Sequence, residues 1–130
     1  MKQITVMEKY PVFTIEISKN ETTYKNVDEV IAYLKEQIEA HPIAVYIGIF
    51  DHYSHTSSLE VGEIAEGIKD AKNLICCFGK ALPKPEMMAV RPRSFGVADI
   101  GESFVVSFME APNPEANAAM EKWVKAIVNI

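Results

Sequence analysis

Cysteine, tryptophan and long apolar runs are scarce in this chain. The 130 residues contain one tryptophan and two cysteines, and the cysteines, Cys76 and Cys77, are neighbours in the sequence. Adjacent cysteines are not the disulfide framework of a small secreted domain. No segment approaches the ~20 apolar residues of a membrane span, and charges interrupt the first residues where a secretory signal would be apolar. We therefore expect reduced thiols, a cytoplasmic protein and no membrane partner.

Basic residues are also few. The chain has 13 lysines and arginines against 18 acidic residues, which gives a net charge of −5 at pH 7. This excess of negative charge opposes general binding to nucleic acid, so we expect no nucleic-acid partner. The hydrophobic fraction of 48% and the charged fraction of 24% are typical of globular proteins. No repeat or linker divides the chain, and residues 1–130 are predicted to form a single domain.

The spacing of apolar residues predicts three helices. Residues 27–40 carry apolar side chains at helical spacing, and Asn26 supplies an N-cap. A weaker helical pattern covers residues 61–71, where two glycines dilute it. Asn113 and Pro114 begin a third, amphipathic helix, because asparagine caps helices and proline fits their first turn.

Alternating or continuous apolar residues predict the strands. They cover residues 4–7, 13–18, 43–50, 74–78, 95–99 and 104–109. The last two form a hairpin that turns at Gly101, because glycine readily takes a positive φ. Together the elements predict an α+β fold, with an antiparallel or mixed sheet of about four to six strands and helices mainly on one face.

The predicted strand 43–50 has two faces of different character. One face carries a bulky aliphatic row: Ile43, Val45, Ile47 and Ile49. This row suits packing under a helix. The other face carries small and aromatic residues around Gly48, and a glycine inside a strand often marks a bulge or a close approach by another backbone or a ligand. We expect this small-residue face to be a pocket wall or the contact of a homodimer.

The same strand ends in the first candidate site, formed by Phe50, Asp51, His52 and His55. In a continued strand the two histidines face opposite sides, whereas in a turn or helical start they converge. Convergence with Asp51 gives two nitrogens and one oxygen, one ligand short of a closed zinc site. His52 and His55 are therefore candidate metal or haem ligands. The simpler interpretation is that His52 bonds a backbone carbonyl and His55 is solvated.

Nucleophilic chemistry is a weaker alternative at this site. Asp51 can orient His52 as a general base. The available nucleophiles are Ser54, Ser57 and Cys77. No Gly-x-Ser-x-Gly motif occurs, so no reaction is predicted. Vicinal thiols can bind soft metals or be redox-active, but the two cysteines point to opposite faces of a strand and are better explained as packing residues.

A proline-rich basic loop forms the second candidate site. Its basic residues are Lys80, Lys84, Arg91 and Arg93. Guanidinium groups make paired hydrogen bonds to carboxylates, phosphates and sulfur oxyanions, so Arg91 and Arg93 are the stronger candidates. Met87 and Met88 line an apolar pocket, offer thioether ligands to copper or haem, or simply fill gaps, as methionine more often does. The alternative is a solvated loop whose lysines aid solubility.

Three segments resemble the domain-of-unknown-function family 302. They are the strand end Phe50-Asp51-His52, the turn Phe78-Gly79-Lys80 with Met87-Met88 shortly after it, and the hairpin with its Asp-x-Gly turn. The resemblance covers residues 27–109. It implies a small α+β domain with an antiparallel sheet that pairs as a homodimer, and it brings no known catalytic residue.

These observations predict an uncharacterised cytoplasmic α+β domain that binds a small molecule or anion near the Asp51-His52 strand end. The predicted ligand-binding residues are Phe50, Asp51, His52, His55, Arg91 and Arg93. Two alternatives stay open: a metal- or haem-binding redox protein that uses His52 and His55, and a structural or interaction homodimer. The sequence identifies no cofactor and no substrate, and it leaves catalysis undecided.

Overall fold

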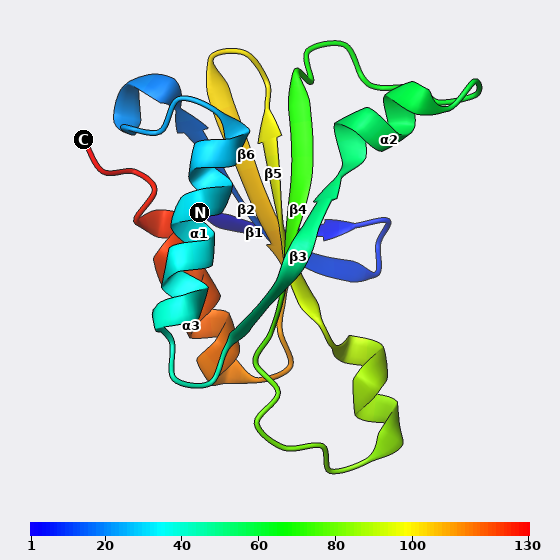
Figure 1. The fold of residues 1–130 in the computed structure, drawn as a ribbon, viewed down its shortest axis with the longest axis vertical. Coiled ribbons are helices and arrows are strands. Elements are labelled where there is room, and N and C mark those ends of the chain that lie inside the picture. The colour runs from blue at the N-terminus through cyan, green and yellow to red at the C-terminus, as the bar shows by residue number, and fades with distance from the viewer.

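A computed structural model describes residues 1–130 and contains six strands and three α-helices (Figure 1). The strands are β1 (Lys2–Val6), β2 (Tyr10–Ser18), β3 (Val45–Asp51), β4 (Asp70–Cys77), β5 (Arg93–Asp99) and β6 (Ser103–Met109). The α-helices are α1 (Val27–Ala40), α2 (His52–Ser58) and α3 (Pro114–Lys125). Two short 3₁₀ helices are η1 (Lys19–Glu21) and η2 (Pro85–Val90).

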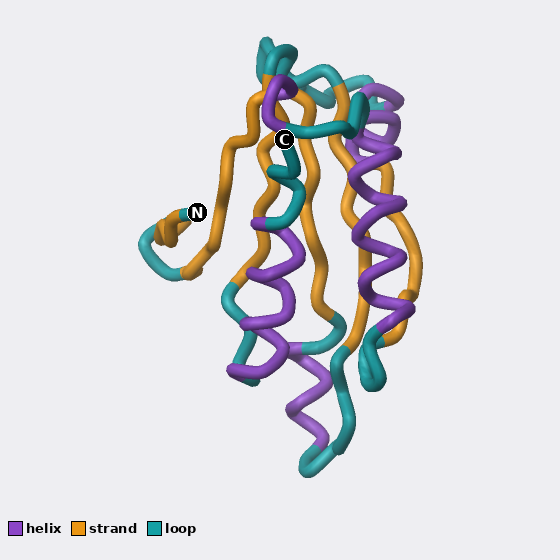
Figure 2. The backbone as a smooth tube through the Cα atoms, turned by 90° about the vertical axis from the view of Figure 1, so that its left-hand side faces the viewer, coloured by secondary structure: helices purple, strands orange, loops and turns teal.

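The six strands form one antiparallel sheet in the order β1-β2-β6-β5-β4-β3. Helices α1 and α3 contact each other and lie on the same face of this sheet (Figure 2). The predicted α+β class is therefore confirmed, and the sheet is antiparallel throughout. Strands β1 and β3 are the two edges, and we call the face that α1 and α3 leave uncovered the open face.

The core lies between the sheet and the two long helices. Helix α1 buries one face, made of Val27, Val30, Ile31, Leu34 and Ile38. Asn26 Oδ1 accepts the backbone N–H of Glu29 at 2.9 Å, which confirms the predicted cap. Phe95 on β5 and Phe104 on β6 are fully buried beneath the helices. Each such aromatic or aliphatic side chain contributes roughly 1.5–3 kcal/mol by leaving water, so the core fixes α1 and α3 on the sheet.

The predicted C-terminal half is largely confirmed. Strands β5 and β6 form the expected hairpin, and Gly101 at its turn has a φ of 102°. Asn113 caps α3, because its Oδ1 accepts the backbone N–H of Glu115 at 2.9 Å. Pro114 is the first residue of α3, as its missing N–H and fixed φ predict.

The helix predicted over residues 61–71 is wrong. The chain instead forms α2 directly after β3, and β4 already begins at Asp70. The two glycines explain the difference. Gly62 packs against the carbonyl group of Thr56, where a Cβ would collide, and Gly67 has a φ of 102° that does not fit a right-handed helix.

Strand β3 departs from the predicted alternation. Its register against β4 shifts between Tyr46 and Gly48, where Ile47 is an extra residue. A bulge changes the face on which the following side chains lie. The aliphatic row predicted to pack under a helix is instead exposed, with accessible fractions of 55% for Val45, 53% for Ile47 and 49% for Ile49. The bulge also splits this row, because Val45 pairs with Cys77 on the open face whereas Ile49 pairs with the core residue Leu74 on the helix side. All three side chains stay exposed because β3 is an edge strand with no neighbour on its outer side.

The small-residue face of β3 is also corrected. Ala44 and Tyr46 pack against the core on the helix side, and Lys35 Nζ of α1 lies 4.5 Å from the centre of the Tyr46 ring. Beyond the bulge, Phe50 pairs with Asn73 on the other side of the sheet. The predicted face is therefore split between two surfaces and cannot form one continuous pocket wall or dimer contact.

Candidate functional site

Asp51 ends β3 and caps α2. Its carboxylate accepts the backbone N–H of Ser54 at 2.9 Å and the Ser54 hydroxyl at 3.0 Å, and Lys72 Nζ lies 3.9 Å away. The backbone N–H of Ser54 is the main cause that lowers the pKa of Asp51 below its ordinary value. The carboxylate thus bonds Ser54 and not His52, so the general-base pair considered from the sequence is not formed.

His52 and His55 converge because the strand stops at Asp51. Their ring centres lie 4.6 and 5.5 Å from the centre of the Phe50 ring, and both residues are exposed. No group of three His, Cys, Asp or Glu side chains in the structure is arranged to hold a metal ion. Metal or haem binding by His52 and His55 therefore stays a prediction that rests on two nitrogen donors.

The loop of residues 79–92, which joins β4 to β5, lies at the end of the sheet opposite to α2 (Figure 1). Four of the five main cavities adjoin this loop, and the other lies along α1. Arg91 lines three of the four, with volumes of about 50, 270 and 450 Å³. The two smaller hollows share Phe78, Arg91, Asn113 and Ala116. We call these two together the loop–α3 cleft. None of the five main cavities is lined by residues 50–58.

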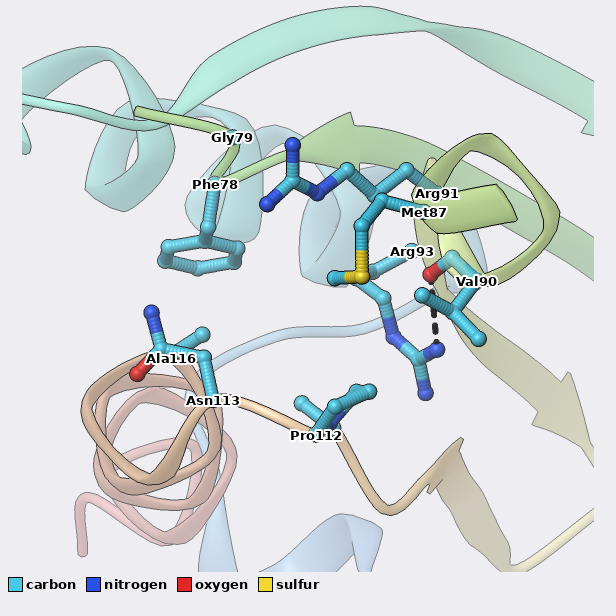
Figure 3. Close-up of a pocket in the computed structure, with 10 residues that line it drawn as sticks. Phe78, Gly79, Met87, Val90, Arg91, Arg93, Pro112, Asn113 and Ala116 are labelled. Atoms are coloured by element: carbon cyan, nitrogen blue, oxygen red, sulfur yellow. Dashed lines mark hydrogen bonds between the residues drawn. The ribbon is translucent and has the colours of Figure 1, made fainter. Parts of the chain in front are cut away.

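Arg91 reaches the cleft by passing close over Gly79. A Cβ at position 79 would lie 2.9 Å from Arg91 Nη1, so glycine is what leaves room for the guanidinium. Nη1 donates to the carbonyl oxygen of Ala81 at 2.6 Å, and this is the only hydrogen bond of the side chain. Figure 3 shows the guanidinium extending from the loop towards Phe78. Its remaining N–H groups have no protein acceptor and are free to bind a ligand.

Arg93 lies below Arg91 and is bonded to the protein itself. Nη1 donates to the carbonyl oxygen of Val90 at 3.0 Å (Figure 3), and Nη2 donates to those of Met109 at 2.8 Å and Glu110 at 2.9 Å. Burial lowers the pKa of Arg93 from its ordinary value, although a guanidinium stays charged at neutral pH. Its buried Nε has no partner. Arg93 therefore joins the loop to the β6–α3 connection, and it keeps only the Nε donor and one Nη1 donor unused.

The inner wall of the cleft is aromatic. Phe78 stacks on Trp123 with ring centres 5.7 Å apart, and His41 meets both rings edge-on at 5.5 and 5.8 Å. His41 Nδ1 accepts the backbone N–H groups of Ile43 and Ala44, both at 3.1 Å. This pattern assigns the proton of the neutral ring to Nε2. The imidazole thereby fixes the turn between α1 and β3 at the mouth of the cleft.

The opposite wall is the first turn of α3. Asn113 and Ala116 line the cleft there, and the Ala116 N–H has no acceptor in the protein. The start of a helix carries a partial positive charge. Lys80 and Arg91 add full positive charges to the same cleft, and Glu115 is its one acidic lining residue.

The structure separates the residues that the sequence grouped into one site. Phe50, Asp51, His52 and His55 lie where β3 meets α2, whereas Arg91 and Arg93 lie at the other end of the sheet. Met87 lines the cleft, which agrees with the pocket-lining role among its predicted alternatives. Sequence reasoning missed three further lining residues: His41, Phe78 and Asn113. The sequence marks His41 as the end of a helix, Phe78 as the end of a strand and Asn113 as a helix cap. Each of these signals has a structural explanation and does not indicate a ligand.

The fold and the cleft define a small α+β domain with a six-stranded antiparallel sheet and an arginine-lined cleft at one end. The chain belongs to a family of unknown function, DUF6858, whose profile matches residues 1–129. Membership of an uncharacterised family agrees with the sequence-based expectation, but the resemblance to family 302 named the wrong family. No curated protein and no solved structure matches the chain. None of its helices has the length and apolar character needed to cross a membrane.

Proposed function

We propose that this domain binds a small organic anion in the loop–α3 cleft. The observation that carries the proposal is the position of Arg91, whose guanidinium is held over Gly79 with most of its N–H groups unused. A carboxylate or phosphate is the natural partner of such a group, because it accepts two parallel hydrogen bonds from a guanidinium. The unpaired N–H of Ala116 on the opposite wall is a further donor to the same anion.

The cleft also favours an apolar group on the ligand. Phe78 and Ala116 line both of its hollows, and Met87 lines the smaller one. The larger hollow, about 270 Å³, is slightly smaller than the range of about 300–1,000 Å³ for ligand pockets, which suits a small ligand. The ligand class is therefore a small carboxylate or phosphate ester with one apolar group, for which benzoate and phenyl phosphate are suitable probes.

This proposal moves the anion site away from the Asp51-His52 strand end. At that end the carboxylate caps α2 and the two imidazole rings pack on Phe50, and no main cavity adjoins them. Arg91 lies beside three hollows and offers unpaired donors. A ligand loses hydration when it binds, and contacts with the protein must offset that loss. A cleft offers more such contacts than two exposed imidazole rings, so it is the better site.

Arg91→Gln is expected to weaken binding of phenyl phosphate by at least about tenfold, because a charge-assisted hydrogen bond is worth about 1.5–3 kcal/mol. Isothermal titration calorimetry measures the effect. Gly79→Ala is expected to weaken binding as well, since the added methyl group displaces the guanidinium and leaves its charge in place.

Lys84→Gln is the matched control for these two variants. It removes one positive charge from the same loop, but Lys84 is exposed and lines none of the main cavities. Its affinity for phenyl phosphate should equal that of the wild type. If Lys84→Gln and Arg91→Gln lose the same amount of affinity, general charge attraction explains the binding and the cleft is not the site. A wild-type protein that binds neither benzoate nor phenyl phosphate would refute the proposal.

A homodimer through strand β3 is the second candidate, favoured by the exposed edge of the sheet. An edge strand presents unpaired backbone N–H and C=O groups, and proteins usually protect such edges with charges. Residues 45–50 contain no charged side chain, and Val45, Ile47 and Ile49 are about half exposed. Two copies that pair β3 with β3 would extend the antiparallel sheet and cover these side chains.

Ile47→Lys is expected to convert such a dimer to a monomer, because it places a charge on the paired edge. Analytical ultracentrifugation over a range of protein concentrations measures the dissociation constant, which should rise at least about tenfold for loss of one buried aliphatic contact. Val61→Lys is the control, since Val61 is 88% exposed and lies outside the strands, in the segment between α2 and β4. A monomeric wild type, or a dimer that tolerates Ile47→Lys, would exclude this interface.

A further inference from the structure

The third hollow beside Arg91 contains a thiol. It has a volume of about 450 Å³ and lies under the 79–92 loop next to strand β3. Its polar side chains are Cys77, Lys80 and Arg91, and its apolar wall includes Ile47, Leu82 and Met88. None of its nine lining residues is acidic. The hollow therefore combines a nucleophile, two cations and apolar surface in one place.

Cys77 and Arg91 are neighbours across Gly79. A Cβ built at position 79 would lie 3.2 Å from Cys77 Sγ and 2.9 Å from Arg91 Nη1, so the sulfur and the guanidinium surround the same point. The backbone N–H of Gly79 donates to Cys77 Sγ at 3.3 Å, which directs the sulfur to this side of the strand. Cys77 is half-buried and is one of the residues that line the hollow. A reagent in the hollow therefore contacts the thiol and the cations together.

Cys76 differs from Cys77 in every respect that matters for reactivity. It points into the core, where its side chain is fully buried. Burial raises the pKa of the Cys76 thiol to about 12. The thiolate is the reactive form, so Cys76 is both inaccessible and inert at neutral pH. The adjacent pair thus contains one packing residue and one accessible thiol.

We propose that Cys77 is a site of thiol–disulfide exchange with small disulfides that carry a carboxylate. The Cys77 thiolate attacks one sulfur of the disulfide, a new S–S bond joins Cys77 to half of the reagent, and the other half leaves as a thiolate. The disulfide is itself the oxidant, so no further reactant is required. Arg91 and Lys80 hold the carboxylate while the attack occurs, and the apolar wall receives the remainder of the reagent.

This inference rests on the proposed function in one respect, because Arg91 is the anion-binding residue in both. The two are separable by variant. Cys77→Ser removes the thiol and is expected to bind phenyl phosphate as the wild type does, since the loop–α3 cleft is not lined by Cys77. If Cys77→Ser is poorly folded, Cys77→Ala serves the same purpose.

The test compares two aromatic disulfides on the reduced, full-length protein. Dithiobis(nitrobenzoate) carries carboxylates, and dithiodipyridine is neutral. The measured quantity is the ratio of their rate constants, with the modified residue identified by peptide mass spectrometry. In Arg91→Gln the ratio is expected to fall about fivefold, because one cation near the carboxylate is lost. In Lys84→Gln it is expected to stay unchanged.

The identity of the modified cysteine and the dependence of the rate ratio on Arg91 together test the inference. Modification at Cys77 with an Arg91-dependent rate ratio supports the inference. Modification at Cys76, or a ratio that Arg91→Gln leaves unchanged, overturns it. If Arg91→Gln loses phenyl phosphate binding while the ratio stays constant, the proposed function stands and the thiol inference fails. If the wild-type protein does not bind phenyl phosphate but Arg91→Gln still lowers the rate ratio, the proposed function fails and the thiol inference stands.

Discussion

Replacing Trp123 with alanine is expected to lower the free energy of unfolding by about 3–5 kcal/mol, the usual cost of truncating a buried tryptophan. Trp123 is the only tryptophan in the chain and is 8% exposed. Its ring stacks on Phe78, meets His41 edge-on and lies 6.4 Å from the centre of the Phe95 ring. The side chain therefore joins α3, the sheet and the wall of the loop–α3 cleft, and its loss leaves a cavity at their junction.

Urea denaturation followed by far-UV circular dichroism measures this change, because the variant has no tryptophan fluorescence. Trp123→Phe is the control. It keeps an aromatic contact with Phe78 and should lose less than half as much stability, since it removes less buried volume. The hydrogen bond from the Tyr33 hydroxyl to the Trp123 carbonyl oxygen, 2.7 Å long, survives both changes because it uses the backbone. A loss below about 1 kcal/mol in Trp123→Ala would show that Trp123 does not join these elements.

Arg93→Met is expected to lower the free energy of unfolding by about 2–3 kcal/mol, because it removes three hydrogen bonds from a charged donor. The three acceptors are the carbonyl oxygens of Val90, Met109 and Glu110. Water reaches these carbonyls once the side chain is gone, so the loss is smaller than the sum of three isolated bonds. The loop should also become more mobile, which hydrogen exchange at η2 measures.

Two variants control for charge and position. Arg91→Met removes a neighbouring guanidinium that donates one hydrogen bond to the protein, and it should cost at most about 1 kcal/mol. Arg93→Lys keeps the charge but lacks the planar fork that reaches three acceptors, so it should recover less than half of the loss. Equal stabilities for Arg93→Met and Arg91→Met would contradict the different roles assigned to the two arginines.

Local signals in the sequence correctly predicted the elements that caps, turn residues and apolar spacing within a few residues are enough to define. Helix α1 has an asparagine cap and an uninterrupted apolar face, and its predicted bounds are confirmed. The β5–β6 hairpin has a glycine with positive φ at its turn, and α3 begins at the predicted proline. In each case the deciding interactions lie within a few residues along the chain. The helix predicted over residues 61–71 failed because local contacts of Gly62 and a positive φ at Gly67 override a weak apolar period.

The candidate site was harder to predict because it joins distant parts of the chain. The loop–α3 cleft combines His41, Phe78, Arg91 and Asn113 from four separate segments. Among these only Arg91 carried a functional signal in the sequence. The histidines beside Asp51 carried a stronger one, yet they meet no third metal-binding side chain. Spacing along the chain cannot reveal which strand ends share an edge of the sheet.

By itself the sequence determined the α+β class, the capped helices α1 and α3 and the β5–β6 hairpin, since hydrophobic periodicity and cap chemistry act locally. The tertiary structure decided the rest. It placed β3 at an edge, where its aliphatic row stays exposed, and it bonded Arg93 to the protein while leaving Arg91 free. It also buried Cys76 and opened Cys77 to a cationic hollow. These outcomes depend on strand order and on a one-residue bulge, which long-range packing sets and local sequence does not.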